Sequence, residues 1–187
     1  MCITVPMAGI TGIVLAAGAG TRAGGPKALR LDADGTSWIT LAVDALQSVT
    51  PDVIVVLGAA PDAPVPEGAG VVVASGWELG MSASLRVGLE AVPASDGALV
   101  TLVDLPGMPA SVVERMVEGA WPGVLRQAVY DGRPGHPVLI GRDHVRWAAE
   151  SLDGDRGARA YLLEHGVDEI ECGDLWDGAD VDAPPTP

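Results

Sequence analysis

The segment LAAGAGTRAGGPK, from Leu15 to Lys27, is the stretch of this chain from which its fold can be inferred. It follows a short apolar run, residues 12–16, that has the character of a buried strand. Glycines let backbone N–H groups approach an anion closely and form a concave anion-binding nest. Arg22 and Lys27 add positive charge, and Lys27 is the only lysine among the 11 basic side chains. The scarcity of lysine is a compositional effect. The position of Lys27, in a glycine-rich loop that follows a strand, nevertheless favours a polyphosphate-binding site.

Strand and helix patterns alternate outward from this loop. Apolar runs predict strands, and helical spacing predicts helices. The alternation over residues 8–120 predicts right-handed crossovers and a mostly parallel sheet, with ligands beyond the carboxyl ends of the strands. Two later strands separated by DGRPGH predict a small antiparallel addition. The predicted strands are residues 12–16, 53–57, 71–74, 98–103, 124–130, 137–140 and 167–172, and the predicted helices are 38–49, 81–92, 109–118, 143–151 and 156–165.

Length and charge restrict the class of protein. The 187 residues show no repeat and no linker, which predicts one domain. The net charge of −14 argues against nucleic acid or an anionic membrane as a partner. It also requires local positive charge at any phosphate site. We see no apolar run of about 20 residues and no secretory signal, so we expect a cytoplasmic protein. Cys2 and Cys172 lack metal-ligand spacing, which predicts free thiols.

Two well-known nucleotide motifs fit the loop poorly. Gly18, Gly20 and Ala23 satisfy a loose GxGxxA dinucleotide pattern. A dinucleotide loop runs directly into a helix, whereas residues 24–26 read Gly-Gly-Pro, and no acidic residue ends the strand at 53–57. A phosphate-binding loop of the Walker type needs Ser or Thr after the lysine, and Ala28 stands there.

The whole pattern, L-A-A-G-x-G-x-R-x-G-x-P-K, resembles the signature of the molybdenum-cofactor nucleotidyltransferases, within the NTP-transferase superfamily. The resemblance implies an α/β chain with a three-layer Rossmann-like fold. It further implies that Arg22 and Lys27 hold a triphosphate. Ala23 departs from the family pattern, in which methionine is common there. The loop backbone would frame the base and phosphates through Leu15, Ala16, Ala17, Gly18 and Gly20.

A second segment, GWELGMSASLRVGL at residues 76–89, is a turn of small residues that opens a helix. One interpretation is an ordinary capped helix with Ser82 as the cap. The segment also resembles the nucleotide-contacting part of the cytidylyltransferase branch. That resemblance implies that Ser84 meets the base, with Gly80 and Ser82 beside it, and it favours CTP over GTP.

A third segment, LVDLPGMP at residues 102–109, places a carboxylate just past a buried strand. Mg2+ prefers one or two carboxylates together with phosphate oxygens. The alternative is that Asp104 caps the next helix. The resemblance implies that Asp104 binds Mg2+. The ending DVDAPPTP resembles a family motif that would make Asp182 a second metal ligand, although this ending also fits a solvated acidic tail.

Two weaker segments complete the resemblance. GRPGHPVLI, at 132–140, contains a histidine in a predicted loop, and the resemblance assigns His136 to the acceptor side of the site. LDGDRGARAYLL, at 152–163, would bring Arg156 or Arg159 near the acceptor phosphate, although these residues also suit a helix cap.

The resemblance spans nearly the whole chain, with residues 8–120 as the nucleotide-binding part and 121–187 as the acceptor side. It implies Mg2+-dependent transfer of CMP from CTP to the phosphate of Mo-molybdopterin, with release of pyrophosphate and transient contact with a molybdenum hydroxylase. Three alternatives remain open: a guanylyl or other NTP transferase, an NAD(P)H-dependent oxidoreductase of the branch named nicotine blue oxidoreductase, and a non-catalytic nucleotide-binding protein.

Overall fold

A seven-stranded mixed sheet forms the centre of the molecule in the computed structural model, which describes residues 9–94, 96–154 and 157–181, without the side chain of Arg22. The strand order is β3-β2-β1-β4-β6-β5-β7. The strands are β1 Gly9–Ala16, β2 Val53–Leu57, β3 Gly70–Val73, β4 Asp96–Leu102, β5 Leu125–Tyr130, β6 Arg133–Ile140 and β7 Asp168–Glu171. The helices are α1 Trp38–Gln47, α2 Met81–Glu90, α3 Ala110–Val117, α4 Arg142–Ser151 and α5 Arg159–His165.

The pairing matches the α/β fold that the alternating pattern predicts. β1 pairs in parallel with both β2 and β4, and β2 pairs in parallel with β3. β6 runs antiparallel to its neighbours β4 and β5, while β7 is parallel to β5. The sheet is therefore mostly parallel with one reversed strand, as predicted, and the carboxyl ends of β1, β2 and β4 lie together at one edge.

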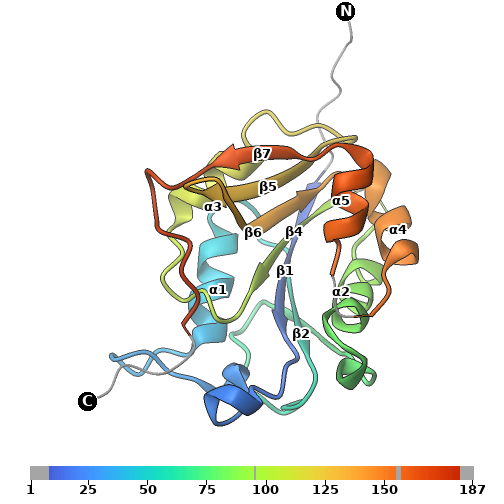
Figure 1. Cartoon of the computed structure of the whole chain (residues 1–187). Helices are drawn as coiled ribbons and strands as arrows, with labels where there is room; N and C mark the ends of the chain where they lie inside the picture. The colour runs from blue at the N-terminus through green and yellow to red at the C-terminus, as the bar shows by residue number, and fades with distance from the viewer. Residues whose placement is uncertain (1–8, 95, 155–156, 182–187) are drawn as a thin grey trace, which may run out of the picture.

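Helices cover both faces of this sheet and give three layers. α1 and α3 pack on one face, and α2, α4 and α5 pack on the other (Figure 1). The two cores are almost wholly aliphatic; Ile13, Val14 and Val55 are fully buried at their centre. Strands that are covered on both faces need such continuous apolar runs, which explains why β1 and β2 lack alternation in the sequence.

The hairpin between β5 and β6 corrects one prediction. The sequence analysis placed a six-residue loop there, but only Asp131 and Gly132 separate the strands, both with positive φ, at 51° and 73°. An Asp-Gly pair at such angles forms the tight turn that suits a twisted hairpin. The carboxylate of Glu171 accepts hydrogen bonds from both turn amides, and backbone hydrogen bonds lower its pKa. His136 consequently lies on strand β6 and not in a loop.

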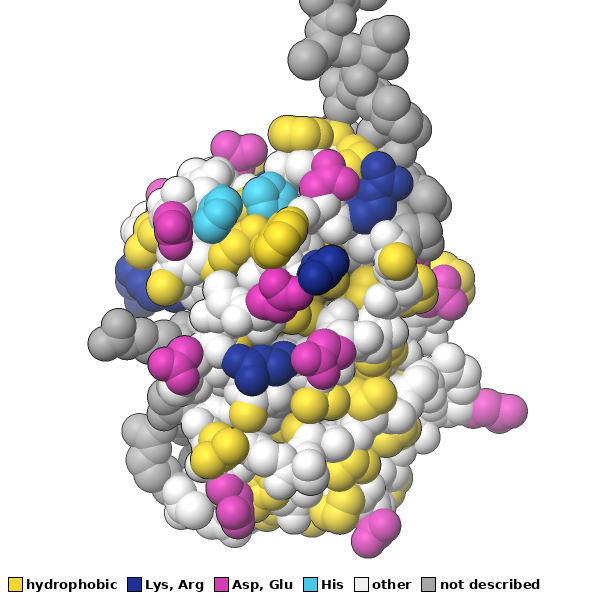
Figure 2. All heavy atoms as spheres, turned by 90° about the vertical axis from the view of Figure 1, so that its right-hand side faces the viewer, with side chains coloured by type: hydrophobic (Ala, Val, Ile, Leu, Met, Phe, Trp, Pro, Cys, Tyr) yellow, Lys and Arg dark blue, Asp and Glu magenta, His cyan; other side chains and the backbone are white. Residues whose placement is uncertain are grey.

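The outer face over α2, α4 and α5 carries interleaved acidic and basic side chains (Figure 2). On α4, for example, Arg146 pairs with Glu150 at 2.8 Å. In the described part of the chain, no helix is long and apolar enough to cross a membrane. Cys172 is a buried free thiol.

Candidate active site

The glycine loop closes on itself directly after β1. The amides of Ala23 and Gly25 donate to the carbonyl of Gly20, at 2.9 and 3.0 Å. Gly20 has φ of +57°, and a Cβ there would lie 2.0 Å from the carbonyl oxygen of Gly25. No other residue fits, because both the backbone angle and the space exclude a side chain. At Gly20 the loop therefore presents backbone and not a side chain.

Arg30 fixes the far side of this loop, a role that the sequence analysis missed. Its guanidinium donates to the carbonyl of Ala23. Its own carbonyl accepts from the amide of Trp38 at 3.0 Å, which ties the loop to the start of α1. An arginine three residues after a lysine was a weak signal in the sequence, because nothing in the spacing showed which carbonyl it would reach.

The end of β1 is held from both sides. The carbonyl of Leu15 accepts from Val103 at 3.1 Å, and the carbonyl of Ala17 accepts from Ala59 at 2.9 Å. Gly58 allows this close approach, since a Cβ there would lie 2.6 Å from the Ala17 oxygen. Backbone hydrogen bonds therefore connect the end of β1 to the segments that follow β2 and β4.

Lys27 and Asp104, 77 residues apart, form an ion pair, with 2.9 Å between Nζ and Oδ2. Their side chains are only 17% and 18% exposed, which limits screening by water. Helix α3 begins after Pro109 and has no side-chain cap, so the alternative that Asp104 caps this helix is wrong. The fold instead brings the loop cation and the strand-end carboxylate to one point.

The second carboxylate oxygen of Asp104 has the properties that a hard cation requires. Oδ1 is buried and has no hydrogen-bond partner among the described residues. An unsatisfied buried carboxylate oxygen is costly, and a divalent cation satisfies it. Within the same residues, no group of three or more His, Cys, Asp or Glu side chains is arranged to hold a metal. Asp104 thus fits Mg2+ as one ligand beside substrate oxygens, whereas Asp182 lies outside the described residues.

A cleft of about 510 Å³ opens over this ion pair. The glycine loop and the end of β4 form one wall, and the turn before α2 forms the other. Ser84, on the first turn of α2, is 5% exposed and faces this cleft. Trp77, in the turn before α2, also lines it and was not singled out from the sequence. The lining includes Leu15, Ala16, Ala17, Gly18, Gly20, Thr21, Lys27, Trp77, Glu78, Gly80, Met81, Ser84 and Asp104.

Ser82 has a different role from the one its sequence position indicated. Helix α2 begins after Gly80 with no side-chain cap, so the predicted Ser82 cap is wrong. The buried hydroxyl of Ser82 instead donates to the Asp153 carbonyl and accepts from the Gly157 amide, each at 3.2 Å. Ser82 does not line the cleft and ties α2 to the segment before α5.

The segment from Cys172 to Val181 runs from β7 to the Asp104 loop along the edge of the molecule (Figure 1). The Val181 amide donates to the Asp104 carbonyl at 2.9 Å. Trp176 packs edge-on against Tyr130, with ring centroids 5.5 Å apart, and lies against Gly107. The segment from Cys172 to Val181 therefore forms a strap that lies against the Asp104 loop.

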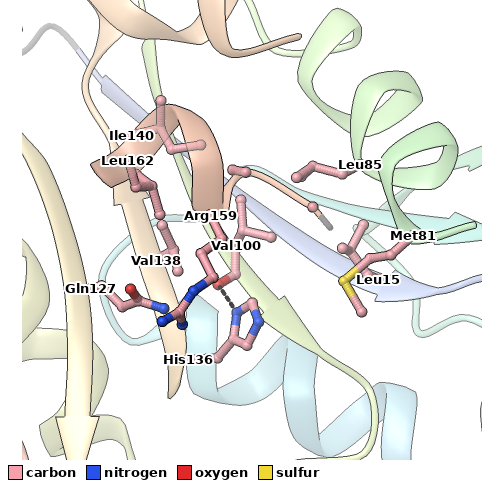
Figure 3. A pocket seen from close by; sticks show the side chains of 12 residues that line it. Leu15, Met81, Leu85, Val100, Gln127, His136, Val138, Ile140, Arg159 and Leu162 are labelled. Atoms are coloured by element: carbon pink, nitrogen blue, oxygen red, sulfur yellow. Dashed lines mark hydrogen bonds between the residues drawn. The ribbon is translucent and has the colours of Figure 1, made fainter. Parts of the chain in front are cut away.

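His136 lines a second, smaller pocket next to the cleft (Figure 3). Its Nδ1 lies 3.3 Å from the carbonyl of Val100 on β4. Burial lowers the pKa of His136, only partly offset by the Val100 contact and the charge of Asp104. The imidazole is therefore neutral at physiological pH. Arg159 lines the same pocket, whereas Arg156 lies outside the described residues.

Comparison with known proteins places this architecture in a family. Residues 12–170 match the model of the MobA-like NTP transferase domain. The chain belongs to the MobA-like NTP transferase family. This membership supports nucleotidyl transfer in general. The matched residues include the glycine loop, Asp104 and the residues that line both pockets.

Several individual proteins resemble the chain over nearly its whole length. Nicotine blue oxidoreductase of Paenarthrobacter nicotinovorans is 37% identical over 191 aligned positions, which cover 92% of each chain. The structure of Rv0371c from Mycobacterium tuberculosis is 31% identical, with a TM-score of 0.75 over 95% of this chain and 94% of that chain. Another structure of that protein is a complex with manganese, at 27% identity and a TM-score of 0.71, covering 94% of this chain and 90% of that chain. A nucleotidyl transfer enzyme from Methanothermobacter shares the fold, at 24% identity and a TM-score of 0.78 over 94% and 93% of the two chains.

Proposed function

We propose that this protein is a Mg2+-dependent cytidylyltransferase that transfers CMP from CTP to the phosphate of Mo-molybdopterin. The observation that carries the proposal is the convergence of Lys27 and Asp104 beneath the glycine loop. A cleft built from backbone amides, one ammonium group and one carboxylate with an unsatisfied oxygen suits a triphosphate with its cation. The manganese complex of Rv0371c supports a divalent cation in this fold.

The reaction needs no protein nucleophile. An oxygen of the acceptor phosphate forms a bond to the α-phosphorus of CTP, and the bond from that phosphorus to the bridging oxygen breaks, so that pyrophosphate leaves. Bound Mg2+ would neutralise charge on the phosphate oxygens. The loop amides orient the triphosphate, and Lys27 and Arg22 balance its charge, while Asp104 holds the cation. Catalysis in such a site consists of positioning and charge neutralisation.

Base selection falls to the wall formed by the start of α2. Ser84 presents a hydroxyl, and Gly80, with φ of 112°, leaves room for a base beside it. A hydroxyl can pair with the donor and acceptor edge of cytosine. The product would supply a molybdenum hydroxylase, with which the protein would make transient contact, and Asp182 would add a second carboxylate to the metal.

The test is a pyrophosphate-release assay with CTP, GTP, ATP and UTP in the presence of Mo-molybdopterin. We expect CTP-selective turnover that Asp104→Ala abolishes. Turnover selective for GTP would instead assign the protein to a guanylyl branch. Binding of CTP without pyrophosphate release would show a non-catalytic nucleotide-binding protein.

A second candidate is an NAD(P)H-dependent oxidoreductase, which the similarity to nicotine blue oxidoreductase favours. The loose GxGxxA match at Gly18, Gly20 and Ala23 is compatible with it. Its distinguishing result is binding of NAD(P)H at micromolar concentration by a protein that does not bind CTP.

A further inference from the structure

Lys27 contacts the same carboxylate that fits a metal ion. Its Nζ lies 2.9 Å from Oδ2 of Asp104, and the two side chains are only 17% and 18% exposed. Oδ1 of this carboxylate is buried and has no hydrogen-bond partner among the described residues. One oxygen of Asp104 is therefore neutralised by the chain itself, whereas the other is not.

Hydrogen bonds hold the backbone on both sides of this ion pair. Lys27 begins a short 3-10 turn, and its carbonyl accepts from the Arg30 amide at 3.1 Å. The Asp104 carbonyl accepts from the Val181 amide at 2.9 Å. Lysine carries its charge on a long flexible stem, whereas the side chain of aspartate is short. The ammonium group can therefore leave the carboxylate while both backbones keep their positions.

The cleft offers little negative charge to a metal ion that arrives without a nucleotide. Among the described residues that line it, the acidic ones are Glu78, which is exposed, and Asp104. The Lys27–Asp104 pair is neutral as a unit, so a divalent cation at Asp104 would face the lysine charge at short range. Such repulsion is strong where little water screens it. In the nucleotide-free protein, the ammonium group thus competes with the metal ion for one carboxylate.

A triphosphate would reverse this competition. Phosphate oxygens at the glycine loop would give the ammonium group a second anionic partner, and charge-assisted hydrogen bonds to phosphate are strong. The carboxylate that Lys27 leaves would then be open to a divalent cation, with phosphate oxygens as further ligands. Metal ion and nucleotide should consequently bind with positive coupling, and each should raise the affinity for the other by the same factor.

We propose that Lys27 is an internal counter-ion of Asp104, which prevents metal binding until a triphosphate binds; the identity of this triphosphate rests on the proposed function. The metal site is on this account completed by the substrate and is not a preformed cage. Within the described residues, no group of three or more His, Cys, Asp or Glu side chains is arranged to hold a metal, which agrees with a site of this kind.

The first test measures binding of Mn2+ alone to the nucleotide-free full chain, by electron paramagnetic resonance of the unbound ion. We expect weak binding to the parent chain. Lys27→Met keeps a long unbranched side chain without its charge and should bind Mn2+ at least about tenfold more tightly. The gain should disappear when Asp104→Asn is added to Lys27→Met. Equal Mn2+ affinity of the parent chain and Lys27→Met would overturn the proposal.

Arg146→Met is the matched control, because it also removes one positive charge and breaks an ion pair. Arg146 pairs with Glu150 at 2.8 Å on α4, is 79% exposed and does not line the cleft. Its substitution should leave the Mn2+ affinity unchanged. A gain equal to that of Lys27→Met would count against the proposal, because the net charge of −14 and not the local ion pair would then govern Mn2+ binding.

A second test observes the parent chain, so it does not depend on how a variant folds. Lys27 is the only lysine in the sequence, so labelling lysine with carbon-13 at the ε position gives a single ε-methylene signal in a nuclear magnetic resonance spectrum. We expect CTP with Mg2+ to move this signal and the same concentration of Mg2+ alone to leave it unchanged. An equal change with Mg2+ alone would overturn the proposal.

The counter-ion role and the proposed function can fail separately. Mn2+ binding by the parent chain that is as tight as that of Lys27→Met would refute the counter-ion role even if CTP turnover is found. A gain of Mn2+ affinity in Lys27→Met, in a protein that releases no pyrophosphate from CTP, would support the counter-ion role and refute the cytidylyltransferase.

Discussion

The nucleotide cleft and the His136 pocket lie side by side but are built in different ways. The cleft is lined by the glycine loop, the end of β4 and the turn before α2, with Lys27 and Asp104 as its charged pair. The pocket is formed by single side chains from four strands and two helices, among them Val100, Gln127 and His136. Much of the cleft lining is glycine-loop backbone, which suits phosphate oxygens, whereas the pocket is lined mostly by side chains, which can distinguish between ligands.

This contrast predicts different consequences for substitutions. A change in the cleft should affect the chemical step or the loop as a whole. A change in the pocket should affect which acceptor is used. The following substitutions probe the two regions, beginning with the largest expected effect.

Asp104→Asn should produce the largest loss. Two unit charges about 4 Å apart interact by roughly 4 kcal/mol at intermediate dielectric, and each 1.36 kcal/mol is tenfold in rate. We therefore expect pyrophosphate release to fall about a thousandfold, on the same scale. Asp44→Asn, on the exposed side of α1, is the control and should retain full rate. A loss of less than tenfold would mean that Asp104 is not the metal ligand.

Gly20→Ala should disrupt the loop without touching any charge. The added Cβ would lie 2.0 Å from the Gly25 oxygen at a backbone angle that disfavours alanine. The expected result is a stability loss of about 1–3 kcal/mol and at least tenfold weaker CTP binding, measured by thermal unfolding and by titration. Gly35→Ala is matched to it, with φ of +83° but open space around the Cβ. If both variants lose stability and CTP affinity equally, the positive backbone angle and not the closure of the loop explains the losses.

Trp176→Ala tests whether the C-terminal strap supports the Asp104 loop. An edge-to-face aromatic pair contributes about 0.5–1.5 kcal/mol, so we expect up to about a tenfold higher Mg2+ requirement with little change in CTP affinity. Trp176→Phe should keep the Mg2+ requirement close to that of the parent chain, because an aromatic ring still packs against Tyr130. Burial also raises the pKa of Tyr130, which keeps its hydroxyl a donor to the His136 carbonyl at 2.6 Å. Trp147→Ala, an exposed tryptophan on α4, is the control. An unchanged Mg2+ requirement in Trp176→Ala would restrict the strap to a structural role.

His136→Asn should have the smallest effect, which is a change in how the free energy of unfolding depends on pH. Burial lowers the pKa of His136 in the folded protein below its unfolded value of about 6.5. The unfolded chain then binds the proton more readily, so stability is present above that value and is lost as pH falls toward the folded pKa. Denaturant unfolding between pH 7.5 and 5 should show the parent chain losing more stability than the variant. Parallel curves for the two proteins would contradict this prediction.

The sequence predicted the seven strands and five α-helices of the described residues, because most of them are apolar runs or helical repeats bounded by Pro or Gly. It also predicted the parallel sheet with its reversed strand. One of its errors is local, and the other depends on a contact between distant segments. The Asp131–Gly132 turn was overlooked and His136 was therefore expected in a loop, although the Asp-Gly pair was a usable signal. Ser82 was expected either to cap α2 or to lie beside the base, but its hydroxyl bonds to the Asp153 carbonyl and the Gly157 amide and does not line the cleft.

The sequence alone determined the glycine loop, because a backbone that must curl under Gly20 and face an anion demands glycine at fixed positions in a continuous segment. It also placed Asp104 at a strand end. Only the tertiary structure decided that Lys27 meets Asp104 at 2.9 Å, that Arg30 holds the loop, and that His136 shares a pocket with Gln127 and Arg159. These relations depend on the order in which strands assemble in the sheet, and strand order is set by packing between segments that are distant in the chain.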